Sequence, residues 1–325
     1  MGRSAAEVLF SLEEENRERE LFRERSDALA EERRRVTGKP LVIGVATYTW
    51  EYQNEPHPIF FGLLEGIKSR ARASSCDVLL YTTIDPDPGT YLRRCQESGV
   101  SGVILHGFTS DNPRVVTLLE ADIPCVGVDD VGLAPRLGHV SADNVSGGLE
   151  AVRHLVAIGR RRIATIHAPL VHSVGQTRLM GYRIGLEKAD LPFRPEYLVE
   201  SDFYVHDGER AMEQLLKLER PPDAVFAASD VMAIGAMAAI ERAGLSVPDD
   251  IALVGFDDSP YATQVTPQLT TIRQDAPAQG IAATEALLRM IADPTVKPIE
   301  FLVPIELIVR ESAPMIAPTA ARPSL

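Results

Sequence analysis

The sequence predicts an α/β protein made of two doubly wound parallel-sheet lobes that follow an N-terminal charged helix. From Leu41 onwards, short apolar runs alternate with helix-like stretches, and the alternation falls into two similar halves that join near residues 159–162. Strands that alternate with helices are typical of parallel sheets covered by helices on both faces. The apolar runs are continuous, which is typical of strands buried on both faces. A chain of 325 residues is long enough for two such domains.

Residues 1–37 differ in composition from the rest of the chain. The stretch EEENRERELFRERSDALAEERRR is dense in both signs of charge and contains neither Gly nor Pro, so it predicts one helix supported by Glu–Arg pairs four residues apart. Apolar residues recur at a seven-residue spacing that Glu15 interrupts, namely Val8, Phe22, Leu29 and Val36. This pattern leaves open a coiled-coil seam, a solvated helix or a frayed arm. The breaker sequence TGKP then marks a linker, so we expect residues 1–40 to form a charged helical arm and linker.

The expected strands are the continuous apolar runs that follow this linker. They are residues 41–47, 77–83, 102–107, 123–129, 162–168, 224–229, 251–256 and 301–309. The expected helices are the helix-like stretches between the strands, namely 59–73, 88–97, 111–121, 145–158, 176–189, 207–218, 230–243 and 276–292.

Charge and cysteine content narrow the class of protein. The formal net charge of −13 argues against an overall attraction to nucleic acid or an anionic membrane, although it leaves a local basic patch open. Three widely spaced cysteines, Cys76, Cys95 and Cys125, suit reduced thiols better than a disulfide framework. The first forty residues have no apolar core of a signal peptide, and the apolar run from Val231 to Ile240 is too short to span a bilayer. We therefore expect a cytoplasmic protein.

Motifs for common catalytic chemistry are absent from the sequence. The first apolar run is followed by YTWEYQNEP, so there is no G-x-G-x-x-G turn for a dinucleotide. There is also no phosphate-binding P-loop, no H-E-x-x-H and no G-x-S-x-G. The His and Cys residues show no metal-ligand spacing. We therefore expect no enzyme activity, no cofactor and no metal.

Polar and aromatic side chains gather where the expected strands end. In doubly wound sheets the ligand crevice lies outside the carboxyl ends of the strands. A carboxylate and a guanidinium bind vicinal hydroxyls through charge-assisted hydrogen bonds, and aromatic rings pack on the apolar face of a sugar or base. The pattern therefore predicts a site for a neutral polyhydroxylated ligand. Its candidate residues are His57, Phe60, Arg178, Phe203, Ser229, Asp230 and Asp257.

From Leu41 to about Ser312 the chain resembles the effector-binding core of the LacI/GalR family of bacterial transcription regulators. The most specific stretches are AVFAASDVMAIGAMAAIERAGLSVPDDIALVGFDDSP and TPQLTTIRQD. Further support comes from VSADNVSGGLEAVRHLVAIGRRRIATI, GQTRLMGYRIGLEKADL and PIELIVRES. Several long motifs in the family's order make a chance match improbable.

The resemblance implies a periplasmic-binding-protein-like fold of type I with a small effector, most simply a carbohydrate, held between the lobes. It implies crossovers near 159–162, 270–275 and 298–304, and a homodimer formed along outer helices that include 59–73. The implied N-terminal lobe is 41–160 with 271–299. The implied C-terminal lobe is 161–270 with 300–313, followed by a tail at 314–325.

The resemblance also assigns roles to single residues, each with a structural alternative. Arg178 matches an arginine that binds effector hydroxyls or carboxylate, but it could instead pair with an acid on its own helix. Asp257 matches an acidic effector contact, but it could instead brace the loop before Pro260. Phe60 and Phe203 match cleft aromatics and could equally be core. Four further residues are implied at the crevice. Ser229 or Asp230 matches an Asn-Asp position, although Asp230 could instead cap the next helix. Asp143 lies at a strand end, and His172 lies at an effector-selective position.

The resemblance does not extend to the family's N-terminal helix-turn-helix. That motif needs two short helices joined by a tight turn, whereas residues 1–37 contain one Gly, at position 2. In residues 1–40, nine basic residues are matched by ten acidic ones, which leaves no basic excess for DNA. Arg33 stands where the family's hinge places a leucine. Two hypotheses follow: a ligand-responsive transcription regulator that contacts operator DNA, or a cytosolic sugar sensor that lacks its own DNA-binding domain and acts through a protein partner.

Overall fold

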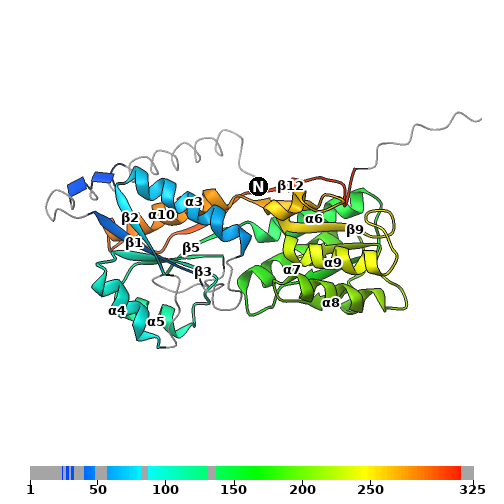
Figure 1. Ribbon diagram of the computed structural model, residues 1–325, viewed down its shortest axis with the longest axis horizontal. Helices are drawn as coiled ribbons and strands as arrows, with labels where there is room; N and C mark the ends of the chain where they lie inside the picture. Colours follow the sequence, from blue (N-terminus) through cyan, green and yellow to red (C-terminus); the bar gives the residue numbers. More distant parts are fainter. Residues whose placement is uncertain are drawn as a thin grey trace, which may run out of the picture. The chain divides into compact units, whose positions relative to one another are not determined.

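The computed structural model describes residues 40–47, 57–81, 87–129 and 137–315, together with Glu24, Asp27, Ala28, Glu31 and Glu32. Apart from these residues, the charged helix expected over 1–37 and the tail expected over 314–325 lie outside the described part. The chain divides into two compact units, shown in Figure 1. Unit 1 comprises Met1–Val140 and Ala276–Phe301, and unit 2 comprises Ser141–Asp275 and Leu302–Leu325. The chain therefore passes from one unit to the other three times.

Unit 1 is built on a six-stranded sheet with the order β11-β5-β4-β3-β1-β2. Its strands are β1 (Leu41–Thr47), β2 (Cys76–Tyr81), β3 (Gly102–His106), β4 (Cys125–Val128), β5 (Leu137–Ala142) and β11 (Glu300–Val303). The five strands from β1 to β5 pair in parallel.

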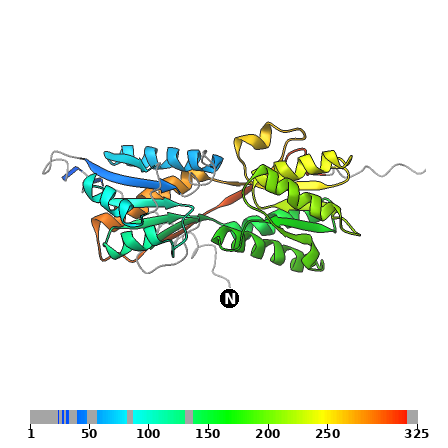
Figure 2. The same ribbon diagram turned by 60° about the horizontal axis from the view of Figure 1, so that its bottom comes forward.

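Four helices cover the unit 1 sheet. They are α3 (Pro58–Ala73), α4 (Gly89–Glu97), α5 (Pro113–Glu120) and α10 (Ala276–Ala292). Helices α3 and α10 lie together on one face, and α4 and α5 cover the other, as Figures 1 and 2 show.

Unit 2 repeats this plan with the strand order β12-β10-β9-β8-β6-β7. Its strands are β6 (Ile163–His167), β7 (Leu198–Glu200), β8 (Ala224–Ala227), β9 (Ala252–Asp257), β10 (Thr270–Gln274) and β12 (Ile305–Ile308). Its helices are α6 (Asn144–Ala157), α7 (Ser173–Lys188), α8 (Val205–Leu216) and α9 (Asp230–Arg242), with short 3₁₀ turns at Pro195–Tyr197 and Pro260–Thr263.

The alternation of side chains along the unit 2 strands creates two cores. Val225 of β8 packs in a core with residues of α8 and α9, such as Met212 and Ala236. Its neighbour Phe226 packs in a second core with residues of α6 and α7, such as Tyr182. Successive residues of a strand point to opposite faces, so a continuous apolar run supplies both cores. This explains why the expected strands contain no polar alternation.

The expectation of two parallel-dominated sheets with helices on both faces is confirmed, but some strands differ from those expected. Strand β5 is absent from the expected apolar runs, although the resemblance implied a strand end at Asp143. Strands β7 and β10 were not expected, because β7 is very short and β10 carries the polar sequence TTIRQ. The single strand expected at 301–309 is two strands, β11 and β12, that belong to different sheets and flank Pro304. Proline cannot donate a hydrogen bond to a neighbouring strand. Strand β12 also pairs antiparallel with β10, so the unit 2 sheet is mixed.

Three helix pairs pack closely because each helix carries a glycine at the crossing. A Cβ atom added at any of these glycines would lie about 2 Å from a backbone oxygen of the partner helix. This distance is far shorter than van der Waals contact. The pairs are Gly66 with Gly280 for α3 and α10, Gly148 with Gly181 for α6 and α7, and Gly208 with Gly235 for α8 and α9.

The close packing of α6 on α7 determines where the first passage between units falls. The family resemblance implies a first lobe that continues to residue 160, whereas the structure changes unit between Val140 and Ser141. A Cβ atom at Gly148 of α6 would meet the carbonyl oxygen of Arg178, and one at Gly181 of α7 would meet that of Val145. Helix α6 therefore belongs with α7 in unit 2. The other passages, at 275–276 and 301–302, fall within or beside the expected crossover regions.

Candidate functional site

The candidate site in unit 2 is centred on an ion pair at the carboxyl end of β9. Asp257 is the last residue of β9, and Arg178 lies in the second turn of α7. The guanidinium Nη1 lies 3.6 Å from the carboxylate Oδ1, and each residue is 3% exposed. The structure thus brings together the two residues on which the predicted ligand site most depends.

Further contacts fix the guanidinium of Arg178 in one orientation. Its Nε donates to Asn144 Oδ1 at 2.7 Å, and its Nη1 donates to the carbonyl oxygen of Ala228 at 2.5 Å. The guanidinium also stacks over the ring of Phe256 at 3.6 Å. These partners come from α6, from the end of β8 and from β9. The contacts therefore differ from the alternative in which Arg178 pairs with an acidic residue of its own helix, α7. A guanidinium held this way is a preorganised hydrogen-bond donor.

The carboxylate of Asp257 is held as firmly. Gln274 Nε2, at the end of β10, donates to Asp257 Oδ1 at 2.6 Å. The backbone of Asp257 has φ of 116°, a conformation that costs about 1–3 kcal/mol for a residue with a side chain and that clusters at functional sites. The role of bracing the following loop falls instead to Asp258, which forms ion pairs with Arg273 and Arg310.

Ser229 and Asp230 are both fully buried and engaged within the fold. Ser229 Oγ accepts from the backbone N–H of Met232 and caps α9. Asp230 accepts from the N–H of Ser259 at 2.6 Å and from the hydroxyl of Thr271 at 2.5 Å. The helix cap therefore lies one residue earlier than the alternative expected for Asp230. Burial raises the pKa of Asp230 to about 6, because the apolar surroundings penalise its charged form.

The remaining predicted residues of unit 2 lie where helices begin. Asp143 caps α6, because its Oδ1 accepts from the N–H of Ser146 at 3.0 Å. His172 precedes α7 and Phe203 lies just before α8, and their rings contact edge-on with centroids 6.3 Å apart. Both side chains are half-buried. An aromatic pair of this kind can form the wall of a pocket for a ligand.

Two predicted residues, His57 and Phe60, lie in unit 1 and form a second cluster there. Phe60 of α3 is fully buried, and its ring centroid lies 5.6 Å from that of His106, the last residue of β3. His106 Nδ1 lies 3.1 Å from Thr47 Oγ1 at the end of β1. His57 is buried at the N-cap position of α3. These side chains gather at the carboxyl edge of the unit 1 sheet.

Sequence reasoning missed several residues of these clusters. Asn144 and Gln274 hold Arg178 and Asp257, while His106 and Thr47 surround Phe60. Thr47 and His106 end apolar strands, and Asn144 lies next to the selected Asp143, so the position at a strand end was a signal for these three. Gln274 ends the polar strand β10, and no signal in the sequence identified it.

The three cysteines lack the exposed, readily ionised thiol that a catalytic nucleophile requires. All three thiols are buried and free. Burial raises their pKa values, that of Cys76 to about 11, so the thiols are protonated at neutral pH. Within the described residues no group of three or more His, Cys, Asp or Glu side chains is placed to hold a metal ion. No helix among those residues combines the length and apolarity needed to cross a membrane.

Two parallel-dominated sheets with helices on both faces define a two-unit α/β protein with a periplasmic-binding-protein-like fold. The family profile of the periplasmic binding protein-like domain matches residues 152–313. In sequence, the chain is 36% identical over 215 residues to the HTH-type transcriptional regulator CelR of Thermobifida fusca, covering 66% of this chain and 63% of CelR. It is 32% identical over 243 residues to the HTH-type transcriptional repressor PurR of Proteus mirabilis, covering 73% of this chain and 70% of PurR.

Solved structures agree with the sequence relatives. A transcriptional regulator CelR–cellobiose complex matches with a TM-score of 0.78 and 29% identity, over 83% of this chain and 84% of that chain. A regulatory protein of the LacI family from Chloroflexus aggregans matches with a TM-score of 0.74 and 30% identity, over 83% and 98% of the two chains. The chain therefore belongs to the LacI/GalR family of transcription regulators. The matched part spans just under two thirds of the length of CelR, and also of a second relative, the probable HTH-type transcriptional repressor ExuR of Bacillus subtilis.

Proposed function

We propose that this protein is a ligand-responsive transcription regulator whose effector is a small sugar-like molecule bound at Arg178 and Asp257. The observation that supports this most is the buried pair itself, which places a fixed donor and a fixed acceptor at the carboxyl end of a parallel sheet. Such sheets bind ligands at this edge. One solved relative is described as a complex with cellobiose, which agrees with a carbohydrate effector.

In this proposal the ligand is recognised through its hydroxyls and its apolar ring face. The guanidinium of Arg178 donates to hydroxyl oxygens, and the carboxylate of Asp257 accepts from hydroxyl protons. The ring pair of His172 and Phe203 packs against the apolar face of the sugar. His57 and Phe60 of unit 1 stay predicted effector contacts. Asp143, Ser229 and Asp230 do not bind the effector directly in this proposal. They hold the backbone near the site by accepting hydrogen bonds from the N–H groups of Ser146, Met232 and Ser259.

Isothermal titration against mono- and disaccharides, purines and sugar phosphates tests the effector site. We expect one class of binder and expect Asp257→Asn and Arg178→Met to weaken it roughly 10- to 100-fold, since each removes a charge-assisted hydrogen bond. Arg183→Met is the matched control, because Arg183 lies on the same helix and stacks over Phe193 instead. Circular dichroism establishes that each variant is folded. A flat response across the panel, or an affinity that folded Asp257→Asn leaves unchanged, would refute the site.

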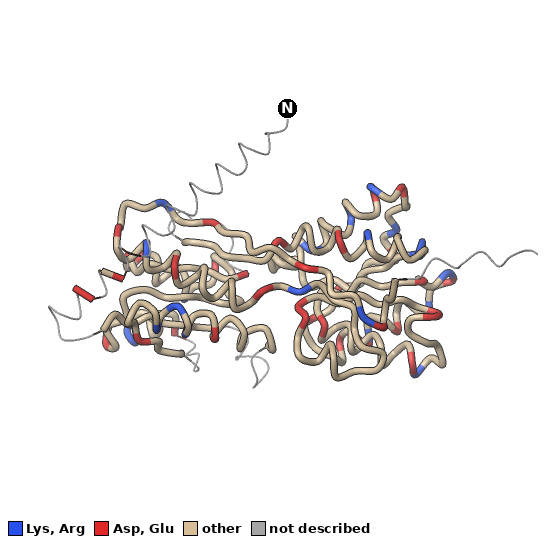
Figure 3. Tube along the Cα trace, turned by 90° about the horizontal axis from the view of Figure 1, so that it is seen from above, with Lys and Arg blue, Asp and Glu red and all other residues tan. Residues whose placement is uncertain are grey.

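The proposal extends to operator DNA and to a homodimer, through which effector binding would control transcription in the cytoplasm. A gel shift of the chain on DNA from its own upstream region tests direct binding, and sedimentation velocity tests the dimer. Figure 3 shows acidic residues interspersed with basic ones along the described chain, and the net charge is −13. This charge balance agrees with the second candidate, a sugar sensor that acts through a protein partner. A gel shift that shows no binding with micromolar protein at moderate salt would favour that candidate over the first. Neither candidate involves turnover of the bound sugar, and a hydrolysed or modified product would contradict both.

A further inference from the structure

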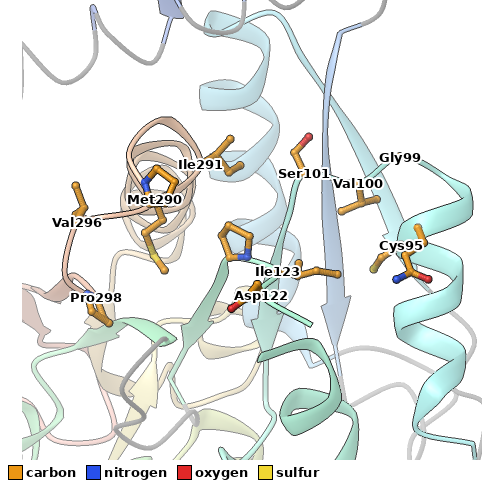
Figure 4. A pocket seen from close by; sticks show the side chains of 13 residues that line it. Cys95, Gly99, Val100, Ser101, Asp122, Ile123, Met290, Ile291, Val296 and Pro298 are labelled. Carbon is orange, nitrogen blue, oxygen red and sulfur yellow. The ribbon is translucent and has the colours of Figure 1, made fainter. Parts of the chain in front are cut away.

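A hollow lies at the edge of the unit 1 sheet that is opposite to Thr47 and His106. It has a volume of about 540 Å³ and opens at the amino ends of β3 and β4. Small-molecule sites in proteins are typically about 300–1,000 Å³ in volume. The walls come from the segments that follow three helices, shown in Figure 4: Val100 and Ser101 after α4, Asp122 and Ile123 after α5, and Val296 after α10, with Met290 near the end of α10 itself.

The walls of this hollow expose both polar and apolar surface, and the apolar side chains among them suit the ring of an amphipathic ligand. In Figure 4, Met290 of α10 and Val296 lie on one side, Val100 lies on the other, and Ile123 lies between them. Methionine adapts its shape to aromatic and aliphatic groups and makes favourable sulfur–aromatic contacts. A flat, apolar ring system inserted between these side chains would bury apolar surface that is now open to water.

The electrostatics of the hollow select a positive charge. Asp122 is the charged side chain among the described residues that line it. Helices α4, α5 and α10 end at Glu97, Glu120 and Ala292, directly before the segments that form the walls. The carboxyl end of a helix carries partial negative charge, and three such ends lie directly before the wall segments. Arg94 and Arg289, in the last turns of α4 and α10, do not line the hollow, whereas the carboxylate of Asp122 does. An anion is therefore disfavoured and a protonated amine is favoured.

The hollow is also connected to a passage between the units. Pro294, Val296 and Pro298 line it, and the segment to which they belong leads from α10 into β11, where the chain passes to unit 2 after Phe301. The first part of this segment is held by Asp293, whose carboxylate accepts from the N–H and hydroxyl of Thr295. A molecule that fills the hollow would restrict this segment directly.

We propose that this hollow is a second ligand site, which binds a compact amphipathic cation with an apolar ring body and a protonated amine and acts on the passage at 293–301. The site is separate from the strand-end residues of the proposed effector site. It requires neither a sugar nor DNA, so its test is independent of the proposed function.

Methyl NMR on the full chain with ¹³C-labelled methionine tests binding, with tryptamine as the probe. The sequence contains seven methionines, and Met290→Leu identifies the Met290 signal. We expect tryptamine to shift that signal with saturation, while the signals of Met232 and Met237 in unit 2 stay in place. Indole-3-acetate, which has the same ring and the opposite charge, should bind at least several-fold more weakly. No shift of Met290 up to about 10 mM tryptamine, or equal binding of the acid and the amine, would overturn the proposal.

Variants of the walls provide the matched controls. Asp122→Asn should weaken tryptamine roughly threefold or more and leave the neutral indole-3-ethanol unchanged, because only the charge is removed. Ser101→Trp and Val296→Trp, placed on two different wall segments, should each fill the hollow and abolish the shift. A Met290 shift that persists in both folded filling variants would show that the probe binds elsewhere. Tryptamine should also slow amide hydrogen exchange in 294–303 of the unmodified protein, and unchanged exchange at saturation would refute the action on the passage.

Discussion

Arg178 is a buried guanidinium, and the residues around it explain how unit 2 tolerates the charge. Removing a charged group from water costs several kcal/mol unless it is paired and hydrogen-bonded. The carboxylate of Asp257, the amide oxygen of Asn144 and the carbonyl oxygen of Ala228 all accept from this guanidinium or face it. In the proposed function, a sugar hydroxyl would meet donors and acceptors that are already oriented, so little conformational entropy would be lost on binding.

Asp230 predicts a pH dependence of stability. Its pKa is raised from 3.8 to about 6 in the folded protein by burial. Between about pH 4 and pH 6 the folded state therefore retains a proton that the unfolded state has lost. The free energy of unfolding falls as pH rises through this window, by on the order of 3 kcal/mol from this group, and levels off above it.

Urea unfolding of the wild type and of Asp230→Asn, from pH 4 to pH 7, measures this contribution. We expect the difference in unfolding free energy, wild type minus variant, to decrease with rising pH and to become constant above about pH 6. Other titrating groups cancel in this difference. A difference that is flat with pH, or that increases, would show that Asp230 is ionised in the folded protein throughout.

At the scale of elements, the three glycine-mediated helix crossings determine which helices pack together. Helix pairs normally lie 8–10 Å apart according to the side chains at the contact. Here the glycines allow one backbone to touch the other. Helix α6 consequently packs on α7 in unit 2, which places Asn144, its first residue, beside Arg178. The crossing thus positions part of the candidate site.

Gly181→Ala tests this packing. A Cβ atom at Gly181 would lie 2.1 Å from the carbonyl oxygen of Val145, so we expect a loss of about 3 kcal/mol in unfolding free energy. Gly89→Ala is the control, since a Cβ atom there meets only the side chain of Asp87 at 3.6 Å, and its stability should be unchanged or slightly raised. Equal stability of the two variants in urea unfolding would contradict the close crossing.

Arg70 joins elements of unit 1 in the same way that Arg178 does in unit 2. It is buried on α3 and contacts Glu285 of α10, Ser74 and Asp27. Arg70→Met leaves the largely buried carboxylate of Glu285 without this partner, so we expect about 3 kcal/mol of destabilisation. The double variant with Glu285→Leu should recover most of the loss. Arg72→Met, at an exposed position on the same helix, should be neutral in the same thermal or urea measurement, and a neutral Arg70→Met would show that the pair contributes little.

At the scale of the whole molecule, the candidate site in unit 2 lies beside every passage of the chain between units. Asn144 follows the first passage at 140–141, and Gln274 precedes the second at 275–276. The N–H of Asp143 donates to the carbonyl oxygen of Val303, just after the third. In the proposed function, a ligand bound at Arg178 and Asp257 would act on residues that lie next to these passages along the chain, as a ligand-dependent regulator requires.

Hydrogen exchange with and without the effector identified by titration tests this coupling. We expect slower exchange at 141–145, 270–276 and 300–304, because the bound ligand stabilises the closed form of these backbone hydrogen bonds. Residues 209–216 of α8, which hold none of the candidate residues, serve as the internal control. Protection confined to the loops around 172 and 203 would indicate a ligand that does not reach the passages.

The sequence alone determined the alternation of strands and helices, the presence of two sheets and the family of the protein. It also selected Arg178 and Asp257 for one site, and the structure brings these two side chains together. These features depend on apolar runs, helix periodicity and the chemistry of strand ends, all of which are local in the chain. Some local features differ from the prediction: Pro304 separates β11 from β12 where one strand was expected, and the polar strand β10 was not expected.

Only the tertiary structure decided which residues complete the candidate site and to which unit α6 belongs. Asn144 and Gln274 lie 34 and 17 positions from their partners, and the reciprocal glycines of α6 and α7 are separated by a strand and a loop. Contacts of this kind depend on strand order, register and the depth of helix packing, which no short stretch of sequence specifies. Ser229 shows the same limit, since which of two adjacent polar residues caps α9 depends on where Ser259 and Thr271 offer hydrogen bonds to Asp230.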